Sequence, residues 1–455
     1  KYKNHLCDSS DNLYSCYRMY EKALEKLEKL YAFGMLTYHL DMSNQESIKL
    51  FKEVEKLEAD FGTATSFITP EITYTDTTVI EKYLNENTKL KRYTRIINEI
   101  LEDKEHILSK EEENLLANYA EVFNAPENTF DILTNAEFKF GILKDEDGKE
   151  IEMTESNYSL YIRSLNEEVR KQAFTLLYSK YKEFVNTIAE LYLTNVKSSS
   201  INAKIRKYKS SLEQAVKNDD ASIQVYEALI KTVDENIQLN HEFIELKKKL
   251  LQKQDLHMYD LYVNPFEENK DYITYENAIK EVKEALSVIG TKYIDKLDEA
   301  FNNKWLDVYT KENKKGGAYS MGVYGVHPYV LLNFVNSKRD VSTIAHELGH
   351  SMHSYYSNEN QNVIDANYTI IVAEVASTVN EILLSDYQVK HEKDNRKKAE
   401  LLYELLEMIR ATLFRQAMFA EFEKIVHEKV EENAALSSED LNNIYYKLNQ
   451  KYFGK

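Results

Sequence analysis

The scarcity of residues that end helices is the feature of this sequence that most restricts its fold. Only 11 glycines and 4 prolines occur among its 455 residues. Glycine destabilises the interior of a helix, and proline also removes a backbone hydrogen bond. A chain with so few of both can form long uninterrupted helices. Hydrophobic residues make up 43% of the chain and charged residues 29%, which is typical of a folded globular protein. We therefore expect a mainly helical protein.

Apolar residues recur at helical spacing over most of the chain. Tyr20, Leu24, Leu27 and Leu30 lie three to four residues apart, with Glu and Lys between them, as on one face of a helix. Ser109, followed three residues later by Glu112, is a typical helix start. Helices are predicted over residues 17–60, 78–122, 158–252, 272–303 and most of the chain after 335.

Three segments have a different pattern. Residues 145–148 read Asp-Glu-Asp-Gly between short apolar pieces, so a hairpin is predicted over 143–152. Residues 256–265 are rich in tyrosine and β-branched residues, and we expect a strand there. Residues 316–335 hold much of the glycine, and a small hairpin or sheet is predicted. We place a boundary near residue 185, giving a helical lobe over 1–185 and a second lobe over 186–455.

Charge and cysteine content indicate which partners and which cellular compartment to expect for the protein. The formal net charge of -18 argues against nucleic acid and anionic membranes as partners. Cys7 and Cys16 are the two cysteines and imply no disulfide framework, so a reducing compartment, the cytoplasm, is predicted. No apolar run is long enough to span a bilayer. The first residues lack the layout of a signal peptide and an initiator Met, so we expect a processed or incomplete chain.

The segment with the clearest chemistry contains His346, Glu347 and His350. Two histidines four residues apart lie on one face of a helix, about one turn apart. This spacing lets both imidazoles bind one tetrahedral zinc ion. Glu347 is one position further round the helix, where its carboxylate can contact a metal-bound water without binding the metal. Asp340 or Ser342 can cap this helix.

The rest of this helix supports a metal site. Its histidines, with His353 among them, point away from the apolar face. That face is formed by Val341, Ile344, Ala345, Leu348, Met352 and Tyr355. Chance alone gives a His-Glu-x-x-His pattern in about 3% of chains of this composition, so a third ligand is needed to make the case.

Glu374 is the predicted third ligand, for one zinc per chain. Glu374 and Glu381 interrupt a strongly apolar helix and are seven residues apart, hence on the same face. A buried carboxylate is costly unless it is paired or bound to metal. Glu381 either orients a ligating imidazole or makes a surface contact. His353 stands where the three-histidine pattern of other zinc peptidases needs glycine, so we expect a supporting or structural role for it.

Several blocks of this sequence resemble oligoendopeptidase F, of the thimet-type zinc oligopeptidases. They are residues 206–213, 257–263, 317–320, 327–333, 343–354 and 373–381. The resemblance implies a two-lobed, mainly helical zincin of the gluzincin kind, with a small sheet beside the active-site helix. It also implies cleavage of short, unfolded peptides. A peptide strand would then add to Gly317, Ala318, Tyr319 and Ser320, although Tyr319 can equally be a packing residue.

The sequence departs from this family at its ends. The family has a segment before the first helix and a further C-terminal segment with a His-Phe-Tyr element, which this sequence lacks. We therefore expect an internal fragment of the enzyme. The catalytic lobe over 186–455 would lack its C-terminal part, while the metal ligands and the base are present. His257 and His327 are expected to be packed or surface residues rather than parts of the cleft.

The predicted function is that of a zinc metalloendopeptidase, which hydrolyses peptide bonds in short oligopeptides. Glu347 would activate the water, and His346, His350 and Glu374 would hold the zinc. Two alternatives remain: a zinc metallocarboxypeptidase of similar helical fold, and a truncated form that binds zinc and peptides with little turnover. We expect short peptides as partners, no nucleic acid or membrane, and a monomer or small homo-oligomer.

Overall fold

The chain forms two compact units, each built from two separate stretches of sequence. The computed structural model describes residues 1–266 and 272–454. Unit 1 comprises residues 1–107 and 270–402, and unit 2 comprises 108–269 and 403–455. The boundary predicted near residue 185 falls inside unit 2, so these units do not coincide with the predicted lobes 1–185 and 186–455. A single cut in the sequence cannot separate units that the chain enters twice.

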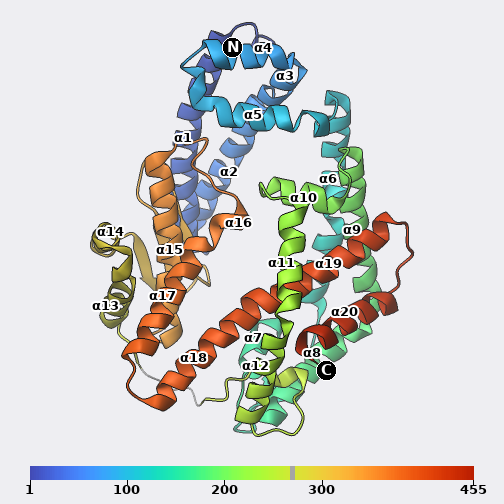
Figure 1. Ribbon diagram of the computed structural model, residues 1–455, viewed down its shortest axis with the longest axis vertical. Helices are drawn as coiled ribbons and strands as arrows, with labels where there is room; N and C mark the ends of the chain where they lie inside the picture. The colour runs from blue at the N-terminus through green and yellow to red at the C-terminus, as the bar shows by residue number, and fades with distance from the viewer. Residues whose placement is uncertain (267–271, 455) are drawn as a thin grey trace. The chain divides into compact units, whose positions relative to one another are not determined.

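Unit 1 contains helices from both of its stretches of sequence (Figure 1). A small sheet lies between α14 and α15 in the sequence. Its α-helices are α1 (Ser10–Leu40), α2 (Gln45–Thr65), α3 (Ile68–Tyr74), α4 (Thr77–Glu86), α5 (Thr94–Glu102), α13 (Tyr275–Leu286), α14 (Thr291–Asn302), α15 (Lys338–Asn360), α16 (Ile370–Ala373) and α17 (Val375–His391). Shorter 3₁₀ turns are η1 (Leu90–Tyr93), η2 (Lys104–His106) and η5 (Ser287–Ile289).

Unit 2 is also mainly helical. Its helices are α6 (Lys110–Asp131), α7 (Glu155–Tyr161), α8 (Glu167–Glu183), α9 (Val185–Ile205), α10 (Ser211–Asn218), α11 (Ile223–Glu235), α12 (Ile237–Leu250), α19 (Arg415–Glu431) and α20 (Ser438–Phe453). It also contains the π-helical segments η3 (Ile132–Glu137) and η6 (Arg410–Phe414) and the 3₁₀ turn η4 (Met258–Asp260). Helix α18 (Asn395–Ile409) begins in unit 1 and ends in unit 2. Among the helices described, none is both long enough and apolar enough to cross a membrane.

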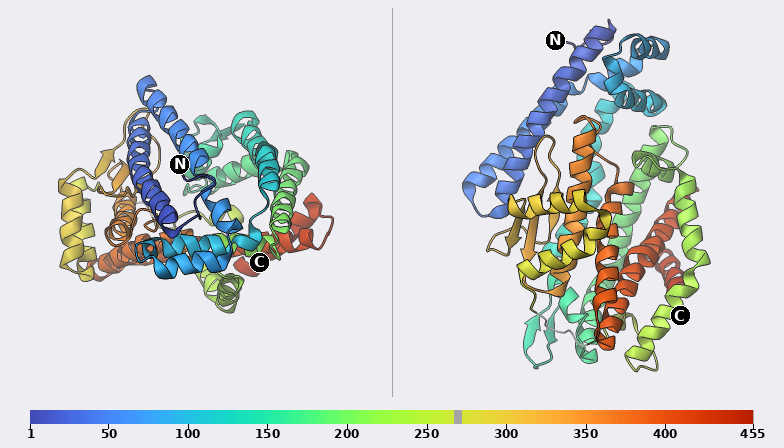
Figure 2. Two further views of the ribbon diagram at one scale, coloured as in Figure 1. Left: turned by 90° about the horizontal axis from the view of Figure 1, so that it is seen from above. Right: turned by 60° about the vertical axis from the view of Figure 1, so that its left-hand side comes forward.

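The predicted helices over 17–60 are confirmed as the pair α1 and α2, which run side by side (Figure 2). The hydroxyl of Ser9 caps α1 by accepting a hydrogen bond from the backbone N–H of Asn12 at 3.2 Å. The buried face of α1 packs with α3, α4 and α5 around a core that includes Tyr17, Ile72 and Tyr93. Cys16 belongs to this core and Cys7 packs against it, both as free thiols.

The sheet predicted over 316–335 forms with an additional strand. Its strands are β3 (Leu306–Tyr309), β4 (Tyr319–Met321) and β5 (Tyr329–Phe334), in the order β3-β5-β4. Strand β5 runs parallel to β3 and antiparallel to β4. Because β5 is central, its apolar side chains are buried on both faces. They pack with the buried faces of α13, α14 and α15 to form the main core of unit 1. This core supports the helix that carries the histidines.

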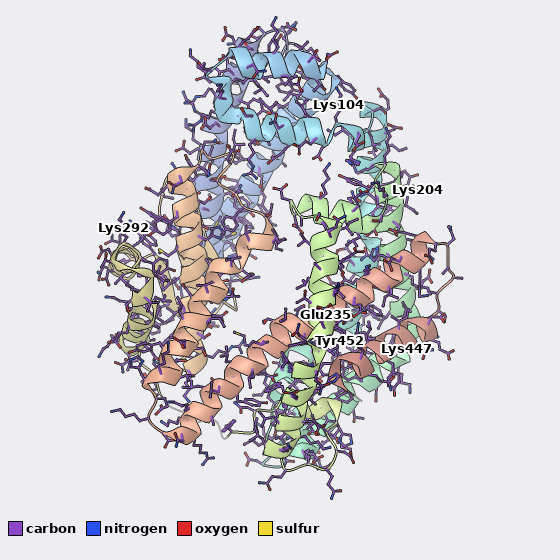
Figure 3. The ribbon with its side chains drawn as sticks, in the orientation of Figure 1. Lys104, Lys204, Glu235, Lys292, Lys447 and Tyr452 are labelled. Carbon is purple, nitrogen blue, oxygen red and sulfur yellow. The ribbon has the colours of Figure 1, made fainter. Side chains whose placement is uncertain are left out.

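Unit 2 contains the other predicted hairpin and several smaller cores. Strands β1 (Ile142–Lys144) and β2 (Glu150–Glu152) are antiparallel, and the predicted turn at 145–148 joins them. Helices α11, α19 and α20 bury a second group of side chains. Tyr452, which is labelled in Figure 3, belongs to this group and is fully buried. Its hydroxyl donates a hydrogen bond to Glu421 at 2.9 Å.

The strand predicted over 256–265 is wrong. The chain forms the 3₁₀ turn η4 there, and the remaining residues are irregular. Asp260 is fully buried at the end of this turn, where it accepts hydrogen bonds from Arg170 at 2.6 Å and from the backbone N–H of His257 at 3.0 Å. A buried carboxylate has to meet its cationic partner. This requirement outweighs the modest strand preference of the flanking tyrosines.

Candidate metal centre and its surroundings

Helix α15 begins one turn earlier than the sequence predicts. Ser337 is its N-cap, and its hydroxyl accepts a hydrogen bond from the backbone N–H of Asp340 at 3.3 Å. The carboxylate of Asp340 in turn accepts a hydrogen bond from the backbone N–H of Ser337 at 2.8 Å. The prediction that Asp340 or Ser342 is the cap is therefore wrong. Asp340 is the reciprocal partner in a capping box, and Ser342 lies inside the helix.

The two sides of α15 differ as predicted. Val341, Ile344, Ala345, Leu348 and Met352 are all buried in the core formed with the sheet. The side chains of His346 and His350 lie on the other side and remain partly exposed. The helix is thus fixed along its apolar face, and both imidazoles are directed out of the core.

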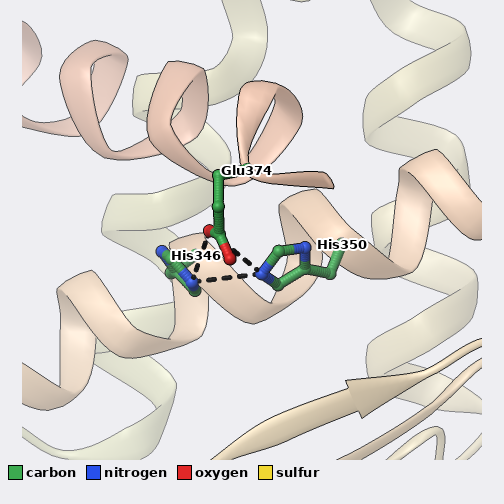
Figure 4. Close-up of side chains that lie close together, drawn as sticks. All are labelled: His346, His350 and Glu374. Carbon is green, nitrogen blue, oxygen red and sulfur yellow. Dashed lines mark hydrogen bonds and ion pairs between the residues drawn. The ribbon is translucent and has the colours of Figure 1, made fainter. Parts of the chain in front are cut away.

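Three side chains bring their donor atoms together on that side of α15 (Figure 4). The Nε2 atoms of His346 and His350 are 3.1 Å apart, and the Oε2 atom of Glu374 is 3.4 Å from each. A tetrahedral ion with bonds of about 2.0–2.1 Å to nitrogen and oxygen needs donor atoms about 3.3 Å apart. The triangle of donors therefore has the size that zinc requires.

Glu374 reaches this triangle from a break between two helices. It is the residue between α16 and α17, with φ at -89° and ψ at 0°. Its side chain is 61% exposed, so the expectation of a buried carboxylate on one continuous helix is wrong. The break turns the end of α16 toward α15, and Ser377 donates a hydrogen bond to Glu374 Oε2 at 2.8 Å. Exposure leaves one side of the donor triangle open to solvent.

The close contact between α15 and α17 depends on a glycine. A Cβ atom at Gly349 would lie 2.5 Å from Ser377 Cα and 2.7 Å from the carbonyl oxygen of Ala376. No larger residue fits unless the helices separate. Asn380 of α17 also links the two helices, because its side chain donates a hydrogen bond to the backbone oxygen of Ala345 in α15 at 2.9 Å. The sequence analysis missed this role of Gly349.

Glu347 lies on the inner side of the same turn. It is 7% exposed, and burial raises the pKa of its carboxyl to about 7. The positive charge of His346 and a hydrogen bond from the backbone of Ser320 oppose this rise. The histidines and Glu374, rather than Glu347, supply the converging donor atoms. A carboxyl with this pKa can both accept and release a proton near neutral pH.

Glu381 contacts the ring of His346 at Nδ1, whereas Nε2 of the same ring belongs to the donor triangle. Its Oε2 atom is 3.1 Å from Nδ1 of His346, and its Oε1 atom accepts a hydrogen bond from Ser342 at 3.2 Å. The hydrogen bond with Glu381 raises the pKa of His346. With Nδ1–H donated to Glu381, the Nε2 lone pair of His346 faces His350 and Glu374. Ser342 is a member of this chain of contacts that the sequence analysis did not identify as such.

Three other histidines that the sequence analysis considered do not join the triangle. The ring of His353 stacks on Tyr368 with centroids 3.7 Å apart, and burial lowers its pKa. The ring of His327 stacks on Trp305 at 5.1 Å, and Nδ1–H donates to the backbone oxygen of Pro328 at 2.7 Å. The ring of His257 in unit 2 stacks on Tyr259 at 4.8 Å. All three make packing contacts.

The segment from Gly317 to Ser320 lies at the edge of the sheet, next to Glu347. Among the strands that the structure describes, β4 pairs with β5 and with no other strand. The hydroxyl of Ser320 is 2.8 Å from that of Ser351, which in turn donates to the backbone oxygen of Glu347 at 3.0 Å. These contacts hold the strand against α15. The contact of Ser351 follows from its position four residues after Glu347, a spacing that the sequence analysis did not use.

Other residues of this segment are anchored from neighbouring elements. The side chain of Asn333 donates to the backbone oxygen of Gly317 at 2.7 Å, and Ala318 packs against the main core of unit 1. The hydroxyl of Tyr319 lies 2.8 Å from Nδ1 of His39 on α1, and burial raises the pKa of Tyr319 to about 12.

A second group of ligand-type side chains lies in unit 2 and does not need a metal. It consists of Glu167, His257 and Asp260. Lys253 is 2.5 Å from Glu167 and 3.1 Å from Asp260, and Arg170 also contacts Asp260. Two cations already balance the two carboxylates, so the site in unit 1 is the better candidate for a metal.

Comparison with known proteins shows which family this chain is similar to. Residues 160–455 match peptidase family M3, and residues 71–140 match the oligopeptidase F family. The oligopeptidase PepF of Bacillus subtilis (strain 168) is 39% identical over 454 residues, which cover 100% of this chain and 68% of that protein. An oligoendopeptidase F homolog of Lactococcus lactis subsp. lactis (strain IL1403) is 37% identical, covering 99% of this chain and 74% of that protein.

Solved structures are similar over the same extent. A peptidase crystal structure from Chlamydophila abortus matches with a TM-score of 0.91 at 34% identity and covers 98% of this chain and 75% of its own. The oligoendopeptidase F of Enterococcus faecium matches with a TM-score of 0.74 at 30% identity. This match covers 100% of the present chain and 76% of the Enterococcus faecium chain. The mainly helical fold with a small sheet and the identity over the whole chain lead to one conclusion: this chain belongs to peptidase family M3, within its oligopeptidase F group.

Proposed function

We propose that this chain is a zinc-dependent endopeptidase that hydrolyses peptide bonds in short oligopeptides, with one zinc ion per chain. The observation that carries the proposal is the donor triangle of His346, His350 and Glu374, with edges of 3.1, 3.4 and 3.4 Å. Two imidazoles and one carboxylate are a ligand set that catalytic zinc sites use, with a fourth position left for water or substrate. Zinc is also the metal of the M3 peptidases.

In peptide hydrolysis, bound zinc and Glu347 would have separate roles. When bound, zinc polarises a carbonyl group and lowers the pKa of a bound water toward about 7. Glu347 is placed to take a proton from the attacking water and to pass it to the leaving amine. Its burial keeps the carboxylate away from bulk solvent, and the contact of Ser351 with the backbone oxygen of Glu347 fixes the turn that carries it. Glu381 holds the ring of His346 in the orientation that binding requires.

Strand β4 supports the assignment of a peptide as substrate. An extended peptide can pair with the free side of an edge strand and satisfy the backbone groups of both. Gly317, Ala318, Tyr319 and Ser320 are the candidate residues for this contact. Because the hydroxyl of Tyr319 is already bonded to His39, we expect the backbone of this strand, rather than that hydroxyl, to meet the substrate.

The proposal is tested with peptides blocked at both ends. The zinc-loaded chain is incubated with an acetylated and amidated peptide of about ten residues, and the products are identified by mass spectrometry. Internal cleavage that disappears with a chelator and returns with zinc is expected. Release of single residues, and only from peptides with a free C-terminus, would instead identify a carboxypeptidase. Zinc binding without any cleavage would indicate a zinc-binding protein with no peptidase activity. The predicted cytoplasmic location and the predicted monomer or small homo-oligomer stay predictions.

A further inference from the structure

Arg415 of unit 2 is held between two aromatic rings. It is the first residue of α19, directly after the π-helical segment η6, and such segments are frequent at functional sites. The guanidinium lies 5.6 Å from the ring centroid of Tyr262 and 5.1 Å from that of Phe419. Contacts with both ring faces fix the plane of a guanidinium and leave its N–H edge available.

Arg415 has no acidic partner among the residues that the structure describes. Within residues 1–266 and 272–454, no carboxylate lies at ion-pair distance from its guanidinium. Arg410 offers a direct contrast, because it lies 6.0 Å from the same Tyr262 ring but is buried and bonded to Glu407 at 3.1 Å. The chain has 76 acidic and 58 basic residues. An arginine that lacks an acidic partner in such a chain can accept an external anion.

Phenol groups surround this arginine. The positive charge of Arg415 acts on Tyr158 of α7, Tyr178 of α8 and Tyr445 of α20, where it opposes the effect of burial on their pKa values. In the part of the chain that the structure describes, the hydroxyls of Tyr158, Tyr178 and Tyr262 form no hydrogen bond and are not sealed from solvent. Each can donate to an anion bound at Arg415.

The neighbouring charges favour the same kind of ligand. Glu407 lies between Lys247 and Arg410, at 3.6 Å from the amine of Lys247. The charge of Arg163 also acts on Lys247. Four cations therefore stand near Tyr262 and Lys247, with Glu407 as the carboxylate bonded to two of them. Among these described side chains the positive charges outnumber the negative one, on a chain with a net charge of -18.

We propose that Arg415, with the surrounding tyrosines, binds the C-terminal carboxylate of a short peptide that ends in an apolar or aromatic residue. This assignment rests on the proposed function, which makes peptides the ligands. A planar guanidinium pairs with a carboxylate through two parallel hydrogen bonds, and the rings of Tyr262 and Phe419 offer apolar faces to the last side chain. A ligand with several negative charges fits less well, since the chain as a whole would repel it.

The test measures peptide binding without turnover, in the full chain carrying Glu347→Gln. Titration calorimetry compares a heptapeptide ending in phenylalanine with the same peptide amidated at its C-terminus. We expect the free acid to bind about 10- to 100-fold more tightly, the effect of a charge-assisted pair. Adding Arg415→Gln should bring the two affinities within about twofold and leave that of the amide unchanged. Arg415→Lys, which keeps the charge but loses the planar pair of donors, should keep part of the preference.

Arg95→Gln is the matched control, since it removes a positive charge from an exposed pair with Glu99 in unit 1. It should leave the preference for the free acid unchanged. Equal affinity for the two peptides in the parent chain, or an undiminished preference in the Arg415→Gln protein, would overturn the proposal. Competition by inorganic phosphate without any preference between the peptides would also overturn it and indicate a general anion site. An acid preference in a wild-type chain that cleaves no peptide would refute the proposed function alone.

Discussion

Gly349 of α15 lies directly against the backbone of Ser377 in α17, where a Cβ atom would come within 2.5 Å of Ser377 Cα. This contact sets the distance between the helix that carries His346 and His350 and the helix that follows Glu374. The third donor of the triangle is thus placed by a residue that has no side chain. The binding of metal should respond to any change in this spacing.

Gly349→Ala should weaken zinc binding, because the added methyl group forces α15 and α17 apart and moves Glu374 away from both imidazoles. We expect a loss of zinc affinity of at least about tenfold and a lower melting temperature, since overpacking at a tight contact costs about 1–3 kcal/mol. Competition with a chromogenic chelator measures the affinity. Gly62→Ala is the control, because this helical glycine has nothing within 4 Å and the change should stabilise α2 by up to about 1 kcal/mol. Equal zinc affinity in both variants would contradict the role of Gly349.

Glu374→Ala should remove one of three protein donors and lower zinc affinity more than any other single change near the site except loss of a histidine. The reduction should exceed the roughly 10- to 100-fold effect typical of an indirect partner. Zinc content after dialysis, measured by atomic absorption, checks this. Glu359→Ala on the exposed end of α15 serves as the comparison and should keep full metal content. A Glu374→Ala protein with full zinc content would exclude this residue as a ligand.

Glu347→Gln should retain zinc and lose hydrolysis. The amide has the size of the carboxylate but cannot take the proton, and a lost general base costs about 100- to 10,000-fold in rate. The assay combines turnover of an internally quenched peptide with metal analysis of the same sample. Release of the metal by this substitution would show that Glu347 is a ligand instead.

Glu381→Gln should lower zinc affinity by about 10- to 100-fold, because a neutral amide holds Nδ1–H of His346 less strongly than a carboxylate does. The contact at 3.1 Å between Glu381 and His346 is the basis for this expectation. Ser342→Ala, which removes only the hydrogen bond to the far oxygen of Glu381, should have a smaller effect in the same chelator assay. The reverse order of the two effects would mean that Ser342 acts on the site by another route.

Asp260→Asn should destabilise the chain at pH 7 by about 3–5 kcal/mol, as expected when one partner of a buried ion pair is removed. Burial raises the pKa of Asp260, but hydrogen bonds from Arg170, from the backbone of His257 and from Lys253 outweigh it, so the pKa lies below its usual value. A carboxyl with a lowered folded-state pKa contributes stability that is complete above the unfolded-state pKa of about 3.9 and is lost as the pH falls below it. The difference between wild type and variant should therefore shrink below about pH 4.

Urea unfolding followed by circular dichroism at several pH values measures that difference. Asp386→Asn is the control, because its pair with Lys390 is exposed and should contribute less than about 1 kcal/mol at any pH. A difference for Asp260→Asn that stayed constant down to pH 3 would exclude the proposed linkage to its ionisation.

The sequence by itself determined the local features of this protein. With 11 glycines and 4 prolines in 455 residues, little could interrupt its helices, and most predicted helices formed. Spacing within one helix fixed His346 and His350 on one face, because a helical turn has the same geometry wherever it occurs. The hairpin over 143–152 also followed from its turn residues, since Asp and Gly favour such turns without help from distant residues.

Only the tertiary structure decided how distant segments meet. The break at Glu374, the contact of Gly349 with Ser377 and the bond from Glu381 to His346 depend on the approach of α17 to α15. The irregular fold of 256–265 depends on Arg170, ninety positions before Asp260. Contacts between residues far apart in the chain leave no periodic pattern, because they arise from the packing of whole helices. For the same reason, no single boundary in the sequence could show that each unit is built from two stretches of the chain.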